Sequence, residues 1–163
     1  MPSIFATSGT TVAMTANTTA PSTFDATGYA ALTFVDLGCI SNIGEFGDEA
    51  TLVTFDCINE GRTKKLKGQR NAGQMTMTIA LDDTTTGYDN IQTASSDNST
   101  GDFHFKVTFP NKQNSSGNGA IRYFSGKVMS AREALGGAND VATINMVVEI
   151  NTAVVKVDST AGV

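Results

Sequence analysis

The stretch "GQMTMTIAL", Gly73 to Leu81, alternates apolar and polar side chains residue by residue. Its apolar positions are Met75, Met77, Ile79 and Leu81. Successive side chains of a β-strand point to opposite faces, so a period of two is typical of a strand with one buried face. The sequence therefore predicts a half-buried strand here, and the same test applied elsewhere decides the fold class.

Three later segments carry related patterns. In "DFHFKVTFP", residues 102–110, the predicted inward side chains are Phe103, Phe105, Val107 and Phe109, and the outward ones are Asp102, His104, Lys106 and Thr108. Pro110 ends this strand because proline cannot donate to a ladder. "VATINMVVEI", residues 141–150, has alternating apolar positions at Ile144, Met146, Val148 and Ile150. "AIRYFSGKVMSA", residues 120–131, alternates less well, and Gly126 is a candidate position for a bulge.

An earlier hairpin is predicted from "TFVDLGCISNIGEF" and "TLVTFDCI", residues 33–46 and 51–58, with the bend at Gly47 to Glu49. Its shared face comprises Val35, Leu37, Cys39, Ile43, Val53, Phe55 and Cys57. A bend at Asp48 would place Cys39 and Cys57 opposite each other. These are the two cysteines of the chain, which excludes a disulfide-stapled scaffold and a four-cysteine zinc site. Free, packed thiols are preferred over a disulfide in a reducing compartment.

One helix is predicted, in "DDTTTGYDNIQTASS", residues 82–96, with Asp82 or Asp83 as its cap. The fold class is therefore mainly β: an antiparallel sandwich or barrel with one short flanking α-helix. A length of 163 residues suits a single domain over residues 1–163. Within it we distinguish an N-terminal arm at 1–24, a basic inter-strand loop at 59–73 and a short C-terminal tail at 155–163.

The N-terminal arm contains no Asp, Glu, Lys or Arg, so it is expected to lie against protein. "TTVAMTA", residues 10–16, can form a strand that pairs with its own sheet or with a neighbouring molecule; a frayed terminus is the alternative. The arm has no basic start followed by a continuous apolar stretch, and no window approaches the roughly 18 apolar residues of a membrane span. We expect that the protein has no membrane partner. We also expect that it is synthesised in a cytoplasm.

Catalytic and metal-binding patterns are missing from the sequence. The single histidine, His104, falls on the polar side of a predicted strand, and no His, Cys and carboxylate cluster has metal-ligand spacing. "DNSTGD" from Asp97 lacks the glutamate that closes a calcium loop. We expect neither an enzyme nor a cofactor. A carbohydrate-binding sandwich is disfavoured because the chain has no Trp and only three Tyr.

The order of these segments resembles a known family. "LGCISNIGEFG", "NAGQMTMTIALDD", the short helix, "FHFKVTFPN", "IRYFSGKVMSA" and "VATINMVVEI" together are similar to the major tail tube protein of long-tailed, lambda-like bacteriophages, over residues 28–150. The resemblance implies a virion protein that self-assembles in the host cytoplasm into stacked hexameric rings. Such a tube carries viral DNA out of the capsid and meets other tail proteins at its ends. A type VI secretion-like tube protein and a non-catalytic β-sandwich binding module remain alternatives.

The resemblance also implies a barrel around the channel. Six subunits with about four strands each, spaced by roughly 4.8 Å, give a circumference of about 115 Å and a diameter of about 37 Å. A conduit must not retain DNA through phosphate contacts, so we expect an acidic or uncharged channel.

A basic segment therefore has to point elsewhere. "NEGRTKKLKGQRNAG", residues 59–73, holds five of the eleven Lys and Arg of a chain with net charge -5. We predict that Arg62, Lys64, Lys65, Lys67 and Arg70 project along the tube axis toward acidic groups of the adjoining ring. The candidate partners are Glu45, Asp48, Glu49, Asp82 and Asp83. A solvated basic hairpin without a partner and direct DNA binding are the alternatives.

Overall fold

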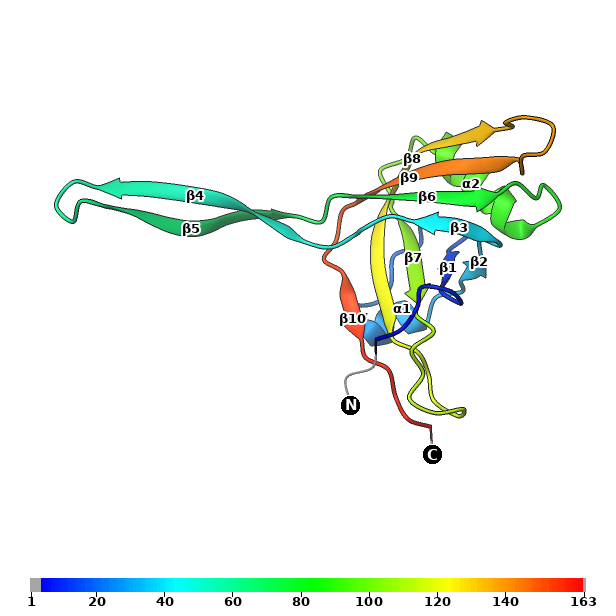
Figure 1. The fold of residues 1–163 in the computed structure, drawn as a ribbon, viewed down its shortest axis with the longest axis horizontal. Helices are drawn as coiled ribbons and strands as arrows, with labels where there is room; N and C mark the ends of the chain where they lie inside the picture. Colours follow the sequence, from blue (N-terminus) through cyan, green and yellow to red (C-terminus); the bar gives the residue numbers. More distant parts are fainter. Residues whose placement is uncertain (1–3, 163) are drawn as a thin grey trace.

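The computed structural model describes residues 4–162, which form one eight-stranded antiparallel sheet and a separate two-stranded hairpin (Figure 1). The strands of the sheet are β1 (Thr11–Met14), β2 (Val35–Asp36), β3 (Ile40–Ile43), β6 (Gln74–Ala80), β7 (Phe103–Thr108), β8 (Ile121–Ala134), β9 (Thr143–Ile150) and β10 (Val155–Val157). The hairpin consists of β4 (Glu49–Cys57) and β5 (Arg62–Asn71). The helices are α1 (Ala26–Ala30) and α2 (Thr86–Ser96). The prediction of a mainly antiparallel β fold with a flanking helix is confirmed.

Strand β8 joins two halves of the large sheet. The strand order is β2-β1-β7-β8-β9-β6-β3, and β10 also pairs with β8. Gly126 lies opposite Phe103 of β7 and Ile150 of β9, so the partners of β8 change at this residue. A Cβ atom on Gly126 would lie 2.2 Å from the carbonyl oxygen of Glu149, so the close approach of β9 requires glycine here. The predicted bulge lies between Val128 and Ser130 instead of at Gly126.

The core lies between the two halves and under α2. It contains the alternating residues of β6 and β9, those of β1 and β7, and Ile91 and Ala94 of α2. Phe105 of β7 stacks on Phe124 of β8 with ring centroids 5.4 Å apart. The inward faces predicted for 75–79, 103–107 and 144–150 are all buried, which confirms the strand assignments made from alternation.

A second layer covers the other face of β7 and β8. The chain from Thr15 to Phe34 crosses this face, and Tyr29 of α1 stacks on Tyr123 with ring centroids 5.4 Å apart. Helix α1, capped by Asp25, was not predicted from the sequence. The predicted strand in the N-terminal arm is confirmed as β1, which pairs with β2 and β7 of its own sheet. The first three residues of that arm lie outside the described residues.

The predicted hairpin of residues 33–58 is wrong. Strand β4 pairs with β5, whereas β3 pairs with β6. Cys39 therefore lies at the exposed edge of the large sheet and Cys57 on the separate hairpin, and both are free thiols. The basic segment is also not a loop, because residues 62–71 form β5 and the turn is confined to residues 58–61.

The predicted cap of α2 is wrong as well. The side chain of Thr85 accepts the hydrogen bond from the backbone N–H of Tyr88. Asp82 closes the preceding turn instead, because its Oδ1 accepts from the N–H and the hydroxyl of Thr84 at 3.1 and 2.6 Å.

Candidate assembly surfaces

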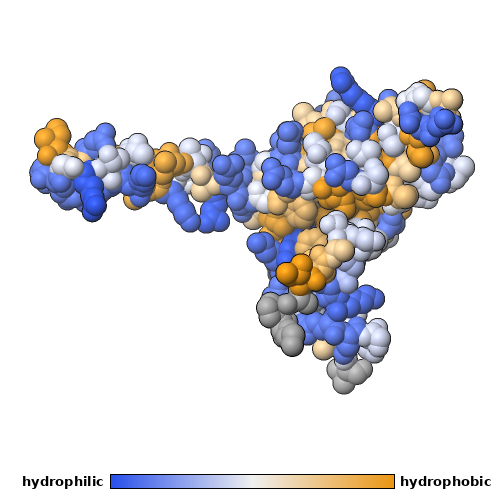
Figure 2. Space-filling model, viewed as in Figure 1, coloured by the Kyte–Doolittle hydropathy of each residue, from blue (hydrophilic) through white to orange (hydrophobic). Residues whose placement is uncertain are grey.

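The β4–β5 hairpin stands away from the rest of the protein (Figure 1). No residue of either strand is buried, in contrast to the long strands β6, β8 and β9 of the large sheet. Phe55 is 66% exposed and Ile58, in the turn, is 100% exposed. Figure 2 shows apolar side chains on this projecting element among hydrophilic ones. A two-stranded ribbon is at best marginally stable alone in water, so this hairpin is suited to contact another molecule.

The two faces of the hairpin differ in chemistry. Residues opposite each other in an antiparallel pair share a face. One face, here called the apolar face, carries the register pairs Val53–Leu66, Phe55–Lys64 and Cys57–Arg62. The other, here called the polar face, carries Leu52–Lys67, Thr54–Lys65 and Asp56–Thr63. The predicted basic residues are therefore divided between two faces and do not form one patch.

Most of these cations have no carboxylate partner among the residues that the structure describes. Lys64 pairs with Glu60 at 2.9 Å across the turn. The other ion pair among residues 4–162 is Lys127–Asp102, so Arg62, Lys65, Lys67 and Arg70 make none within the described structure.

The five predicted acidic partners lie at two separate places, and all are exposed. Glu45, Asp48 and Glu49 line a hollow of about 470 Å³ at the root of the hairpin, together with Gly73 and Gln74. Asp82 and Asp83 follow β6 in the turn before α2. This turn lies at the opposite end of the large sheet from the hairpin (Figure 1).

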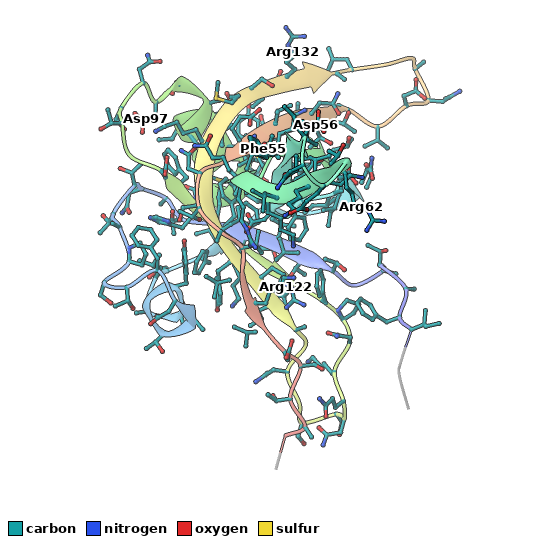
Figure 3. The ribbon with its side chains drawn as sticks, turned by 90° about the vertical axis from the view of Figure 1, so that its left-hand side faces the viewer. Phe55, Asp56, Arg62, Asp97, Arg122 and Arg132 are labelled. Atoms are coloured by element: carbon teal, nitrogen blue, oxygen red, sulfur yellow. The ribbon has the colours of Figure 1, made fainter. Side chains whose placement is uncertain are left out.

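A second hollow of about 410 Å³ adjoins the first and is lined by cations and apolar groups. Its walls are Phe46, Gly47, Asp48, Arg70, Phe109, Arg122, Val154 and Lys156. The guanidinium of Arg122 donates to the carbonyl oxygens of Ile121 and Val157, at 2.9 and 3.0 Å, and lies 5.2 Å from the ring centroid of Phe109. In the view from the hairpin side, Arg122 lies below the hairpin (Figure 3). The sequence did not reveal Arg122 or Lys156 as a pair, because they adjoin only once β8 and β10 are paired.

The comparison with protein families agrees with this arrangement. A family described as phage tail tube protein, TTP, matches residues 3–154. The chain belongs to the phage tail tube protein family. The resemblance seen in the sequence and the predicted function as a structural tail tube protein are thus confirmed. A search of curated protein sequences gives no match for this tail tube protein.

Solved structures with low sequence identity share its fold. A sheath/tube terminator of an extracellular contractile injection system (PVC) has a TM-score of 0.69 at 10% identity, covering 96% of this chain and 99% of that chain. The SPP1 tail tube protein has a TM-score of 0.62 at 10% identity, with 93% and 77% covered. The tail of a gene transfer agent particle, refined with C6 symmetry, gives 0.57 at 16% identity, with 77% and 87% covered.

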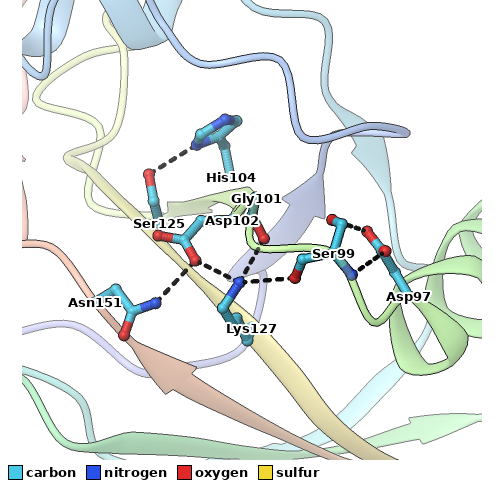
Figure 4. Close-up of polar contacts among 8 residues, drawn as sticks. All are labelled: Asp97, Ser99, Gly101, Asp102, His104, Ser125, Lys127 and Asn151. Carbon is cyan, nitrogen blue, oxygen red and sulfur yellow. Dashed lines mark hydrogen bonds and ion pairs between the residues drawn. The ribbon is translucent and has the colours of Figure 1, made fainter.

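The histidine of this tail tube protein is buried, which contradicts its predicted place on a polar surface. His104 is 2% exposed because the 15–34 segment covers its side of β7. Its Nε2 lies 3.0 Å from the carbonyl oxygen of Thr19, which can only accept, so Nε2 carries the proton. Nδ1 then accepts from the hydroxyl of Ser125 at 2.7 Å (Figure 4), and Ser125 Oγ also lies 2.7 Å from Tyr29 OH. Burial lowers the pKa of His104.

A second polar group of this tail tube protein fixes the loop between α2 and β7. The ammonium of Lys127 donates to the carbonyl oxygens of Gly101 and Ser99, at 2.7 and 3.4 Å, and pairs with Asp102 at 3.2 Å (Figure 4). The Oδ1 atom of Asp97 accepts a hydrogen bond from the backbone N–H of Ser99 at 2.8 Å. Among residues 4–162 no three His, Cys, Asp or Glu side chains are grouped as metal ligands, and none of the helices there is long and apolar enough to cross a membrane.

Proposed function

We propose that this chain assembles head to tail into hexameric rings, which stack into the tail tube of a phage virion. Double-stranded DNA passes through the tube without being held, other tail proteins contact its ends, and assembly takes place in the host cytoplasm. The main observation in support of the ring is that each subunit contains a four-stranded sheet with two unpaired edge strands. A gene transfer agent tail that shares the fold was refined with C6 symmetry, which supports six copies in a ring.

The four strands are β3, β6, β9 and the part of β8 after Gly126. In the described structure β3 pairs only with β6, and residues 127–134 of β8 pair only with β9. Neighbouring strands alternate in direction, and four is an even number. The β8 of a second copy therefore runs antiparallel to the β3 of the first when both copies have the same orientation. Exposed edges usually recruit other strands unless they are blunted, and repeating this pairing closes a barrel.

We propose that the face of these four strands opposite the core lines the channel. It carries uncharged polar side chains such as Gln74, Thr76 and Asn145, and Thr78 donates to Asn145 across the strands at 3.0 Å. By the register, its charged residues are Lys127, Arg132 and Glu149, of which Lys127 is engaged by Asp102. A lining so close to neutral offers DNA few phosphate contacts, as a conduit requires.

The hairpin is proposed to contact a copy in the adjoining ring. It extends roughly in line with β6 and beyond the sheet (Figure 1), and strands of nine and ten residues reach about 30 Å. Arg70, near the root, is then placed beside Asp82 and Asp83 at the facing end of the next copy. Arg62, Lys64, Lys65 and Lys67 reach farther along that copy, toward its Glu45, Asp48 and Glu49.

Charge reversal on the hairpin tests this function. The triple variant Lys64→Glu, Lys65→Glu and Lys67→Glu should form no tubes while its melting temperature stays close to that of the wild type, because all three side chains are exposed. The matched control, with the three lysines changed to Arg, keeps the charge and should assemble. Unchanged polymerisation of the Glu variant would contradict the hairpin contact.

Two further observations separate the alternatives. Negative-stain images of the concentrated wild-type protein should show rings or hollow filaments, whereas dispersed monomers would favour a binding module. A gel shift with duplex DNA at low salt should show no retardation, since the proposed role of the cations is contact between subunits. Retardation that disappears in the triple Glu variant would instead support direct DNA binding.

A further inference from the structure

Two cations lie directly opposite each other beside the root of the hairpin. Arg122 of β8 and Lys156 of β10 are register partners in an antiparallel pair, where like charges destabilise the pairing. Arg70 approaches the same hollow from β5. None of the three makes an ion pair within residues 4–162, although the chain has a net charge of -5. We call this hollow, defined by Arg70, Arg122 and Lys156, the cation pocket.

The cation pocket is arranged to hold an anion. Two backbone carbonyls and the ring of Phe109 fix the guanidinium of Arg122, so its remaining donors are already oriented. Phe46, Phe109 and Val154 form apolar walls around the charges. Arg122 is half-buried beside these apolar groups, where its attraction to an entering carboxylate is stronger than in open water.

We propose that the cation pocket receives the Asp82–Asp83 turn of a copy in the adjoining ring, an inference that rests on the ring stacking of the proposed function. The pocket adjoins the root of the hairpin, and the turn between β6 and α2 lies at the opposite end of the sheet, so a stack with one orientation turns the two sites toward each other at every ring junction (Figure 1). The body of the subunit thus contributes a second contact between rings in addition to the hairpin.

The turn has the charge and shape that this contact needs. Asp82 and Asp83 are adjacent and exposed. The hydrogen bonds from the Thr84 hydroxyl and N–H lower the pKa of Asp82 and keep it ionised. The apolar walls suit a compact acidic turn better than the evenly charged backbone of DNA, and the three cations outnumber the single lining carboxylate, Asp48.

Charge reversal of one exposed pocket residue provides the test. Lys156→Glu should raise the concentration at which tubes form by at least about tenfold. Lys112→Glu makes the same charge change on an exposed residue of the loop after β7, which does not line the pocket, and should leave this concentration within about twofold. Adding Asp83→Lys to the Lys156→Glu variant pairs the new lysine with the new glutamate, leaves Asp82 for Arg70 and Arg122, and should restore assembly. Monomer melting curves check that every variant is folded.

The outcomes are distinguishable. A wild-type protein that forms no rings or tubes defeats the proposed function itself. Normal tubes from Lys156→Glu overturn the pocket contact and leave the hairpin contact standing. Loss of tubes that Asp83→Lys does not restore overturns the Asp82–Asp83 turn as the occupant. If duplex DNA is retarded in a gel by the wild-type protein and not by the Lys156→Glu variant, the pocket binds nucleic acid and the Asp82–Asp83 proposal is overturned.

Discussion

The large sheet and the β4–β5 hairpin have the same secondary structure and opposite environments. Strand β9 buries every second side chain, whereas β4 and β5, which are longer, bury none. Figure 2 shows the hairpin solvated along its visible length. Backbone pairing is therefore sufficient to define strands, but only the sheet has a core that stabilises them within one subunit. The hairpin retains unburied apolar side chains, each worth about 1.5–3 kcal/mol when fully covered, and the proposed contact with another copy would cover them.

Removing the hairpin should have the largest effect on assembly and a small one on folding. We expect a variant that lacks residues 50–70, with Glu49 joined to Asn71 through two glycines, to form no tubes. Its thermal unfolding should stay cooperative, because the deleted residues contribute nothing to the buried core. Electron microscopy and circular dichroism measure the two properties. Tubes formed by this variant would contradict the separation of roles.

The same substitution in the two regions should give very different stabilities. Phe105 is 0% exposed and stacked on Phe124, so Phe105→Ala should lower the free energy of unfolding by about 3–5 kcal/mol. Phe55 is 66% exposed, and Phe55→Ala should change the free energy of the monomer by at most about 0.5 kcal/mol. Urea titration of both variants checks this. Equal losses would mean that the hairpin packs against the body in solution.

Mild acid should weaken the sheet and its second layer. The folded pKa of His104 is lowered by burial below its usual value of about 6.5, so the unfolded chain binds the proton more readily. Stability is then full above about pH 6.5 and falls, by at most about 1.4 kcal/mol per pH unit, as the pH drops toward the folded pKa.

His104→Gln provides the control, because the chain has no other histidine. The pH dependence between about pH 5 and 6.5 should disappear in this variant. Backbone N–H and hydroxyl donors lower the pKa values of carboxylates such as Asp25 and Asp97. These groups therefore lose their contribution to the free energy of unfolding only below the pH range of this test. A wild-type stability that is flat over this range would contradict a buried, neutral His104.

The smallest effect is expected at the turn of the hairpin. Glu60→Gln removes the exposed ion pair with Lys64, which should cost the monomer less than about 1 kcal/mol. Thermal melts at low and high salt measure this, and the difference should vanish at high salt. A cost above about 2 kcal/mol would show that the hairpin is part of the cooperative unit.

The strands of the large sheet could be predicted from the sequence because a strand with one buried face alternates apolar and polar residues. Met75 to Ile79, Phe103 to Val107 and Ile144 to Val148 satisfy this condition, and their strands were predicted correctly. The hairpin was misread because Val53, Phe55 and Cys57 alternate without being buried in the subunit, while β5 has Leu66 as its single apolar residue other than glycine. Alternation shows that a face is apolar, and it does not show which molecule covers that face.

Long-range pairing accounts for the remaining errors. His104 occupies a position that is polar by alternation, and only the second layer from Thr15 to Phe34 makes it a buried residue. Arg122 and Lys156 are far apart in the chain and meet only through the β8–β10 pairing. The five hairpin cations were recognised as a group, but their division between two faces follows from a register that the sequence does not specify.

The parity of the four-stranded sheet has a consequence for tube width. In the proposed ring, the even number of alternating strands in each subunit lets every seam repeat the same antiparallel pairing, whatever the number of copies. Copy number is then governed by how sharply each subunit curves the wall. The irregularity between Val128 and Ser130 bends a strand at that seam, so engineering of wider or narrower conduits should begin there.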